Sequence, residues 1–262
     1  MKTREIAERI ESFCPLHLAE SWDNCGFQID LNNDVRRIYV SLELTYQAVR
    51  EAIRQKADLI VCHHPMMMQP MRKILVSDGD MGRALMLIGD RISVYSAHTN
   101  FDKCEGGNND FFGQVLGLHP IKKLSEEEAY IRTASLLEPM SLRDAAQLVA
   151  DKLRANRGAV RFIGFPGKKV QKLAWCTGGG ADRIDTVADA GFDLFITGDV
   201  RHHDARRAED RGLAVIDAGH YGTELLFIRN MAERLRTLLS DQKNLEVIEA
   251  KECFNPFWHL ID

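Results

Sequence analysis

Residues 57–65 read Ala57-Asp-Leu-Ile-Val-Cys-His-His-Pro65. A short, continuous apolar run of this kind is typical of a strand that is buried on both faces, as in a parallel sheet. Pro65 has no N–H to donate to a neighbouring strand and therefore favours the end of the strand near the two histidines. Functional groups collect beyond the carboxyl ends of parallel strands. We therefore predict a central strand over 58–62, with a candidate site directly after it.

The sequence on either side alternates between strand and helix patterns, which predicts an α/β fold with mixed or parallel sheets. Before residue 122, strands are expected over 37–42 and 92–97, and helices over 3–13, 46–56, 79–89 and 106–116. The pattern then changes character between 122 and 167. From there on, strands are expected over 130–137, 159–165, 172–177, 193–197, 213–217 and 245–250, and helices over 141–154, 181–190 and 223–239.

The chain contains a weak internal repeat. When the sequence is shifted by 135 residues, Ile38–His64 lies over Leu173–Asp199. Each copy reads strand, turn, helix and apolar strand, and each is followed by a further strand that ends at an alanine before a histidine. Few residues are identical, so the order of elements carries the comparison. It predicts two related α/β units, with a site where their strand ends meet.

The amino-acid composition excludes several classes of protein. The 262 residues are 45% hydrophobic and 27% charged, which excludes a disordered chain. The 34 basic and 38 acidic residues argue against a dedicated nucleic-acid module, since such modules carry a basic excess. No apolar run approaches the ~18 residues of a membrane span. The charged N-terminus lacks a signal-peptide pattern, so a cytoplasmic protein is expected. Six scattered cysteines predict reduced thiols.

Histidines gather after the expected strands. His63 and His64 follow the first quoted strand, where two adjacent imidazoles can serve one ion, serve two ions, or remain ordinary loop histidines. Two further pairs, His98 with Asp102 and His220 with Glu224, are spaced i,i+4, which places both side chains on one helical face. Taken singly, each pair is better explained as an ordinary hydrogen-bonded pair or a helix cap than as a metal site. Together, four imidazoles and two carboxylates exceed the needs of one tetrahedral ion and suit two divalent ions.

The types of donor atom limit which metals are expected but do not identify one metal. Mixed nitrogen and oxygen donors without thiolate favour zinc, manganese, iron or cobalt over copper(I). Other features are less specific. Gly178-Gly179-Gly180 suits either a phosphate-binding turn or a tight strand-to-helix turn. His202 and His203 suit either ligand orientation or a basic surface turn beside Arg201.

Five segments taken together resemble the GTP cyclohydrolase I type 2 family, also called the NGG-interacting-factor-three-like proteins. They cover nearly the whole chain in the family's order: Ser21-Trp-Asp-Asn-Cys-Gly26, Ala57–Pro65, Ser96-Ala-His-Thr-Asn-Phe-Asp102, Ile196-Thr-Gly-Asp-Val-Arg-His-His-Asp-Ala205 and Ile216-Asp-Ala-Gly-His-Tyr-Gly-Thr-Glu224. The chain departs from the family at Glu43, where an Asp is usual, and at Met66–Gln69, which replaces a pattern richer in Leu and Phe. No presumed ligand is lost.

The resemblance implies a dinuclear metal site between two α/β units. It implies ligation by a set of five side chains, namely His63, His64, Asp102, His220 and Glu224. His98 matches a site histidine whose ligation varies, and we assign it the catalytic role of general acid or base. The first unit is expected to comprise 1–122 plus about 218–262, and the second 123–217. A hexameric ring is also implied.

Two functions remain open from the sequence. The first is a metal-dependent hydrolase of the GTP cyclohydrolase type, with GTP or another nucleotide as its small-molecule substrate, in which activated water attacks the purine imidazole ring and formate is released. The second is a non-catalytic protein for metal binding, metal delivery or regulatory interaction. A ring that encloses nucleic acid is disfavoured by the net charge of −4.

Overall fold

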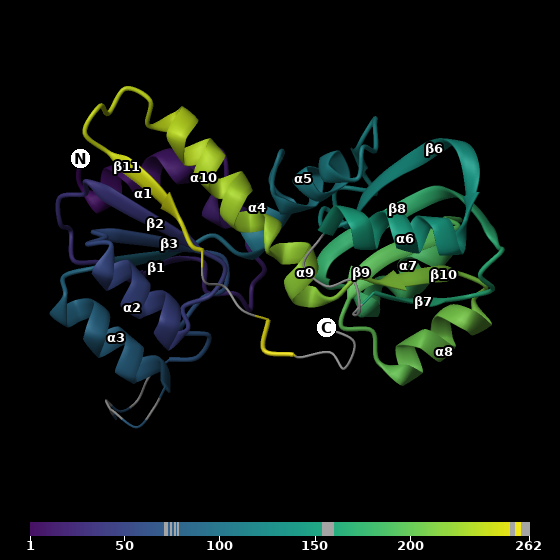
Figure 1. The fold of residues 1–262 in the computed structure, drawn as a ribbon, viewed down its shortest axis with the longest axis horizontal. Coiled ribbons are helices and arrows are strands. Elements are labelled where there is room, and N and C mark those ends of the chain that lie inside the picture. The colour runs from purple at the N-terminus through teal and green to yellow at the C-terminus, as the bar shows by residue number, and fades with distance from the viewer. Residues whose placement is uncertain are drawn as a thin grey trace. The chain divides into compact units, whose positions relative to one another are not determined.

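A computed structural model describes residues 1–70, 73, 75, 77, 79–153, 160–251 and 255–257. The chain forms two compact units, and each is described by itself (Figure 1). The first unit contains residues 1–107 and a C-terminal segment that starts at Phe227, and the second contains Asn108–Leu226 together with residues 255–257. The last residues of the expected helix 141–154 and the first of the expected strand 159–165 lie outside the described residues, as does Cys253.

The first unit is built on a five-stranded sheet in the order β1-β4-β3-β2-β11. Its strands are β1 (Gly26–Ile29), β2 (Arg37–Ser41), β3 (Leu59–Cys62), β4 (Ser93–Ser96) and β11 (Glu246–Glu249). The pairs β11–β2, β2–β3 and β3–β4 are parallel, and β1 is antiparallel to β4. Because the three central strands run in the same direction, their carboxyl ends meet at one edge of the sheet.

Helices cover both faces of this sheet. They are α1 (Thr3–Glu11), α2 (Tyr46–Arg54), α3 (Gly79–Gly89), α4 (Thr99–Lys103) and α10 (Leu226–Leu238), with a 3-10 turn η1 at Leu16–Leu18. Figure 1 shows α2 and α3 on one face and α1 and α10 on the other. Thr45 starts α2 by accepting a hydrogen bond from the Ala48 N–H at 3.1 Å. Apolar residues of α2 and α3 pack with Tyr39, Ile60 and Val94 of the sheet.

The second unit has a six-stranded sheet in the order β5-β6-β8-β9-β10-β7. Its strands are β5 (Lys122–Lys123), β6 (Arg132–Ser141), β7 (Arg161–Ile163), β8 (Lys169–Gly179), β9 (Leu194–Gly198) and β10 (Ala214–Asp217). The pairs β8–β9 and β9–β10 are parallel, whereas the outer pairs are antiparallel. The parallel strands β8, β9 and β10 therefore end at one edge, as β2, β3 and β4 do in the first unit.

The second unit buries a separate apolar cluster on each face of its sheet. Its helices are α5 (Asn108–Val115), α6 (Leu142–Leu153), η2 (Ala181–Arg183), α7 (Ile184–Asp189), α8 (His202–Asp210) and α9 (His220–Glu224). One cluster joins α5 and α6 to the sheet around Trp175, and the other joins α7 and α8 to it around Phe195. Ser141 caps α6 as expected, since its hydroxyl accepts from the Asp144 N–H at 3.1 Å.

The boundaries between the two units differ from those expected from the sequence, which were 1–122 plus about 218–262 for the first unit and 123–217 for the second. Residues 108–122 and 218–226 belong to the second unit, not to the first. The reason is local packing of α5 and α9 on the second sheet. The Trp175 indole N–H donates to the Asn109 carbonyl at 2.8 Å, and Arg132 pairs with Asp110 of α5. The Gly178 N–H in turn donates to the Thr223 hydroxyl of α9 at 2.9 Å.

The mixed α/β class with two sheets is confirmed. Two expected elements differ in detail. The single helix expected over 223–239 is two helices, α9 and α10, and residues expected as a basic turn at 201–203 lead into the helix α8. Five cysteines are free thiols, and four of them are buried: Cys14, Cys62, Cys104 and Cys176. Over the described ranges, no helix is both long and apolar enough to cross a bilayer.

Candidate metal centre

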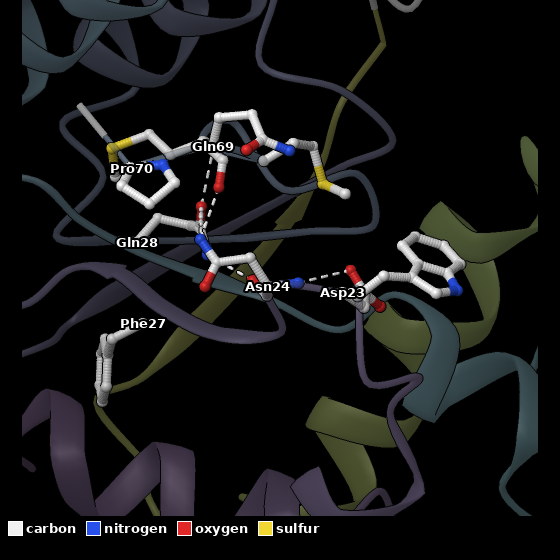
Figure 2. Close-up of a pocket in the computed structure, with 9 residues that line it drawn as sticks. Asp23, Asn24, Phe27, Gln28, Gln69 and Pro70 are labelled. Carbon is white, nitrogen blue, oxygen red and sulfur yellow. Dashed lines mark hydrogen bonds between the residues drawn. The ribbon is translucent and has the colours of Figure 1, made fainter. Parts of the chain in front are cut away.

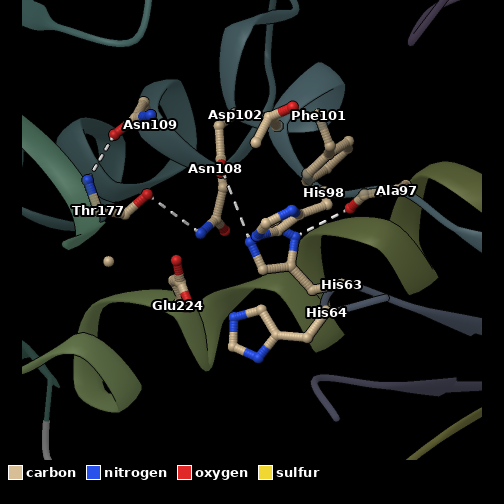
Figure 3. A network of polar contacts seen from close by, with 12 residues as sticks. His63, His64, Ala97, His98, Phe101, Asp102, Asn108, Asn109, Thr177 and Glu224 are labelled. Carbon is tan, nitrogen blue, oxygen red and sulfur yellow. Dashed lines mark hydrogen bonds and ion pairs between the residues drawn. The ribbon is translucent and has the colours of Figure 1, made fainter. Parts of the chain in front are cut away.

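His63 stands where β3 ends, with its ring fully buried. Its Nδ1 lies 2.9 Å from the Ala97 carbonyl oxygen (Figure 3). A carbonyl can only accept, so Nδ1 carries the hydrogen and the lone pair of the neutral ring is on Nε2. This is the tautomer that a metal-ligating histidine adopts when its second nitrogen is held by a backbone carbonyl. The Ser96 hydroxyl also donates to the His63 carbonyl at 2.7 Å, which fixes the backbone here.

Two further imidazoles reach the same place from the neighbouring loops. The ring of His63 lies 5.2 Å from that of His64 and 5.0 Å from that of His98, measured between centroids. One nitrogen from each of the three rings lies within 4.8 Å of the others. Three nitrogen donors at this separation can hold one divalent ion. The three side chains gather because β3 and β4 are parallel neighbours whose carboxyl ends share an edge.

Asp23 orients His98, and sequence reasoning gave it no role. The His98 Nδ1 donates to the Asp23 carboxylate at 3.0 Å, and the Thr99 N–H donates to its other oxygen at 3.1 Å. Burial acts to raise the pKa of Asp23, but the hydrogen bonds from His98, Cys25 and Thr99 outweigh it and hold the pKa well below its usual range. The carboxylate therefore stays ionised at neutral pH and leaves Nε2 of His98 available for chemistry.

Asp102 and Glu43 place carboxylates beside the first two histidines. Asp102 lies in the short helix α4, and its Oδ2 is 3.6 Å from Nε2 of His63 (Figure 3). Glu43 follows β2, and its Oε1 is 3.4 Å from Nδ1 of His64. Glu43, which replaces the usual Asp of the resembled family, therefore lies at the site through its longer side chain. Nothing in its local sequence marks this contact, which depends on the pairing of β2 with β3.

The second unit carries its own histidine and carboxylate group at the ends of β9 and β10. His220 begins α9, and its Nε2 is 2.8 Å from Glu224, one turn further along. Its Nδ1 is 2.8 Å from Asp199, which follows β9. Burial lowers the pKa of His220, but the Glu224 and Asp199 carboxylates outweigh it and raise the pKa to about 9. The i,i+4 spacing thus brings His220 and Glu224 together as expected.

Glycines at the ends of β8 and β9 make room for this helix. Gly178 has a φ of +71°, and a Cβ there would lie 2.1 Å from Oε1 of Glu224. A Cβ on Gly198 would lie 2.5 Å from the His220 backbone nitrogen. Only glycine permits so close an approach with this backbone conformation. Gly178 is therefore explained by the position of Glu224, and the 3-10 turn η2 follows the glycine run directly.

The predicted site residues fall into two groups. His63, His64, His98 and Asp102 lie together in the first unit, and His220 and Glu224 lie together in the second. In both groups the donors are imidazole nitrogens and carboxylate oxygens, a set that fits zinc, manganese, iron or cobalt. His202 and His203 lie at the exposed start of α8, with ring centroids 5.5 Å apart. The three carboxylates at Asp23, Glu43 and Asp199 are the site residues that sequence reasoning missed.

The chain is similar to known proteins over almost its whole length. The model of the Duf34/NIF3 (NGG1p interacting factor 3) family matches residues 1–256. The chain is 31% identical to a "GTP cyclohydrolase 1 type 2 homolog" of Clostridium perfringens over 98% of its length and 99% of the relative's. It is also 31% identical to the protein of the same name in Lactococcus lactis, over 99% of this chain and 100% of that one.

A solved structure shows the same fold. The crystal structure of a Bacillus cereus protein related to NIF3 superposes with a TM-score of 0.92, covers 99% of each chain and shares 22% sequence identity. The family model matches almost the whole chain, and two relatives are 31% identical to it over nearly their full length. The chain belongs to the Duf34/NIF3 (NGG1p interacting factor 3) family.

Proposed function

We propose that the protein holds two divalent ions and uses them to hydrolyse a nucleotide. The proposed ligands are His63, His64 and Asp102 from the first unit, with His220 and Glu224 from the second. The observation that carries the proposal is the gathering of His63, His64 and Asp102 at the end of β3, where Nε2 of His63 lies 3.6 Å from Oδ2 of Asp102 and the two imidazole centroids are 5.2 Å apart. His63 and His64 also each have a second nitrogen beside an acceptor, as metal-ligating histidines do.

Two bound divalent ions would supply the acidity that deprotonates a water and the positive charge that stabilises a developing oxyanion. The chain's own contribution begins with His98. Because Asp23 fixes Nδ1 of His98, its Nε2 is the atom that gives or takes a proton during the reaction. The Asp23 carboxylate stabilises the imidazolium that forms when Nε2 is protonated. His98 therefore serves as the general acid or base of the proposed mechanism.

The proposed substrate is GTP or another purine nucleotide, and the names of the relatives support it. Water adds at C8 of the purine imidazole ring, the C8–N9 bond breaks and a formamide forms at N7. A second water then hydrolyses this formamide, which releases formate and leaves a free amine. We further propose that the protein works in the cytoplasm as a homo-oligomer, with a hexameric ring as the expected form.

Formate release from GTP tests this function directly. The protein is stripped of metal, reloaded with zinc, manganese, iron or cobalt, and assayed for formate by coupled oxidation. Glu224→Ala is the inactive variant, and Glu233→Ala, which removes an exposed glutamate from α10, is the matched control. Formate that depends on metal, is lost in Glu224→Ala and is kept in Glu233→Ala supports the proposal. Tight stoichiometric metal without formate would instead support the non-catalytic metal-binding function.

A further inference from the structure

The first unit contains a pocket beside His98 that the ligand set does not use. It has a volume of about 390 Å³ and is lined by residues 22–24, 27–28 and 67–70 (Figure 2). These residues come from the loop before β1, from β1 itself and from the loop after β3. The volume lies within the range of small-molecule sites. Trp22 and Asp23 join the pocket to His98: the Trp22 and His98 ring centroids are 6.2 Å apart, and Asp23 accepts from His98 at 3.0 Å.

The pocket offers a flat aromatic surface. Trp22 is 59% exposed, although large aromatic side chains are usually buried. Phe27 and the thioethers of Met67 and Met68 provide further polarisable surface in the lining. Aromatic side chains exposed in this way stack on the faces of planar heterocycles, and such stacking accepts any base because every base has a π-face.

The amides of the pocket are partly fixed and partly available. Gln28 bridges the two loops, since its Oε1 accepts from the Met67 N–H at 3.1 Å and its Nε2 donates to the Asn24 carbonyl at 2.6 Å. The Asn24 Nδ2 donates to the Met67 carbonyl, which leaves Oδ1 of Asn24 as an acceptor. The exposed Gln69 amide makes no hydrogen bond to any residue that the structure describes. Figure 2 shows Asn24 and Gln28 facing the segment that carries Gln69 and Pro70.

The charge of the pocket disfavours an anionic ligand. Asp23 is the one charged residue among the described residues that line it, and its side chain is fully buried. Its oxygens accept from the His98 ring and from the N–H groups of Asn24 and Thr99, which keeps it ionised. A phosphate placed against this carboxylate would be repelled, whereas an uncharged ring carrying donors and acceptors would not.

We propose that this pocket binds the uncharged purine base of the substrate. The base stacks on Trp22, and its donor and acceptor edge is read by the amides of Asn24 and Gln69. The ring then lies beside Nε2 of His98, and the phosphates lie outside the pocket. This inference rests on the proposed function, because that function makes the bound base part of the substrate. Binding of the base can nevertheless be measured without metal and without turnover, so the two claims are tested separately.

The experiment is calorimetric titration of the full-length, EDTA-treated protein with guanosine, and with ribose 5-phosphate as a competitor. Trp22→Ala removes the stacking surface and Gln69→Ala removes the available amide. Two matched controls in the second unit remove an exposed apolar side chain and an exposed amide, Leu137→Ala and Gln147→Ala. Circular dichroism melts confirm that each variant folds. Because Gln69 is exposed and makes no described hydrogen bond, Gln69→Ala keeps the test valid if Trp22→Ala fails to fold.

We expect one guanosine per chain, bound equally with and without metal. Trp22→Ala should weaken binding about tenfold, and Gln69→Ala about threefold to tenfold. Neither control variant should change it, and ribose 5-phosphate should not compete. Absence of guanosine binding, unchanged affinity in both pocket variants, or displacement by ribose 5-phosphate would each overturn the inference. If guanosine binds as expected but no formate is formed, the proposed function fails and the pocket assignment stands.

Discussion

His63, His98 and His220 share one local design. In each, Nδ1 faces an acceptor: the Ala97 carbonyl for His63, Asp23 for His98 and Asp199 for His220. In the neutral ring of His63 this contact sets the tautomer, and in all three residues it fixes the orientation of the ring. None of these acceptors is next to its histidine in sequence, so the design depends on the pairing of strands. The imidazoles could be recognised from the sequence, whereas their acceptors could not.

His98 is predicted to act as a proton carrier and not as an essential ligand. His98→Gln should lower metal-dependent formate release by about 100-fold or more, because general acid–base catalysis contributes that much. Asp23→Asn should lower it less, since the ring remains but its orientation is weakened. Metal content, measured in the same preparations, should be unchanged. His17→Gln, at an exposed histidine of the same unit, should have no effect. Loss of a bound ion in His98→Gln would make His98 a ligand instead.

Gly178 is predicted to be essential for metal binding because of the space it leaves. In Gly178→Ala, the new methyl group would displace the Glu224 carboxylate, whose Oε1 lies 2.1 Å from the Cβ position. Gly191→Ala is the matched control in the same unit, because Gly191 has a φ of +75° and nothing within 4 Å of its Cβ position. Both variants should lose about 1–2 kcal/mol of stability from the left-handed backbone. Only Gly178→Ala should lose metal; equal metal retention in the two would contradict this explanation.

At the scale of elements, the hydrophobic pattern of the sequence predicted the position of an element where that element has a buried apolar face. The strands β2, β3, β4, β9 and β10 are short apolar runs, and the structure places them within one or two residues of the expected bounds. The helix α8 was missed because its described residues are almost all polar or charged, and only Asp204 and Ala208 are buried. β1 was missed because its four residues lie at the edge of the sheet and are only half buried in the middle. Packing on the neighbouring elements decides both.

The contact between α1 and the residues after α10 makes a pH-dependent contribution to the stability of the folded protein. Arg9 donates to both carboxylate oxygens of Asp241, at 2.7 and 2.9 Å, and to the Leu238 carbonyl at 3.0 Å. These hydrogen bonds hold the pKa of Asp241 well below its usual range. A carboxyl group with a lowered folded-state pKa stabilises the protein above its unfolded pKa of about 3.9, and this contribution disappears as the pH falls through the folded-state value.

Asp241→Asn should therefore lower the melting temperature of the metal-free protein at pH 7 by a small amount. The difference from the wild-type protein should shrink as the pH is lowered below about 4, because the Asp241 carboxylate of the unfolded wild-type chain takes up a proton there while the folded protein still holds it ionised. It should also shrink in 1 M salt, because both partners are at the surface. Scanning calorimetry at several pH values provides the measurement. A difference that stays constant from pH 7 to pH 3 would show that the Asp241 charge plays no part.

At the scale of the whole molecule, the proposed ligands are divided between two units with similar sheets. Each unit presents its site residues at the carboxyl edge of three parallel strands. The order of strands and helices in the sequence predicted that both units would place polar site residues at this edge. It did not predict that α5 and α9 pack with the second sheet, because that choice depends on Trp175, Arg132 and Gly178, which are distant in sequence. We propose that neither unit alone holds both ions.

The measurement that tests this account most directly is the metal content per chain, by mass spectrometry, of protein purified without an affinity tag. It is made for the wild type, for His63→Ala in the first unit, for Glu224→Ala in the second and for the double variant, with Glu233→Ala as control. We predict about two ions per chain in the wild type and the control. Each single variant should lose at least one ion, and the double variant should hold none. No stoichiometric metal in the wild type after reconstitution, or two ions retained in the double variant, would contradict the dinuclear centre and the hydrolase built on it.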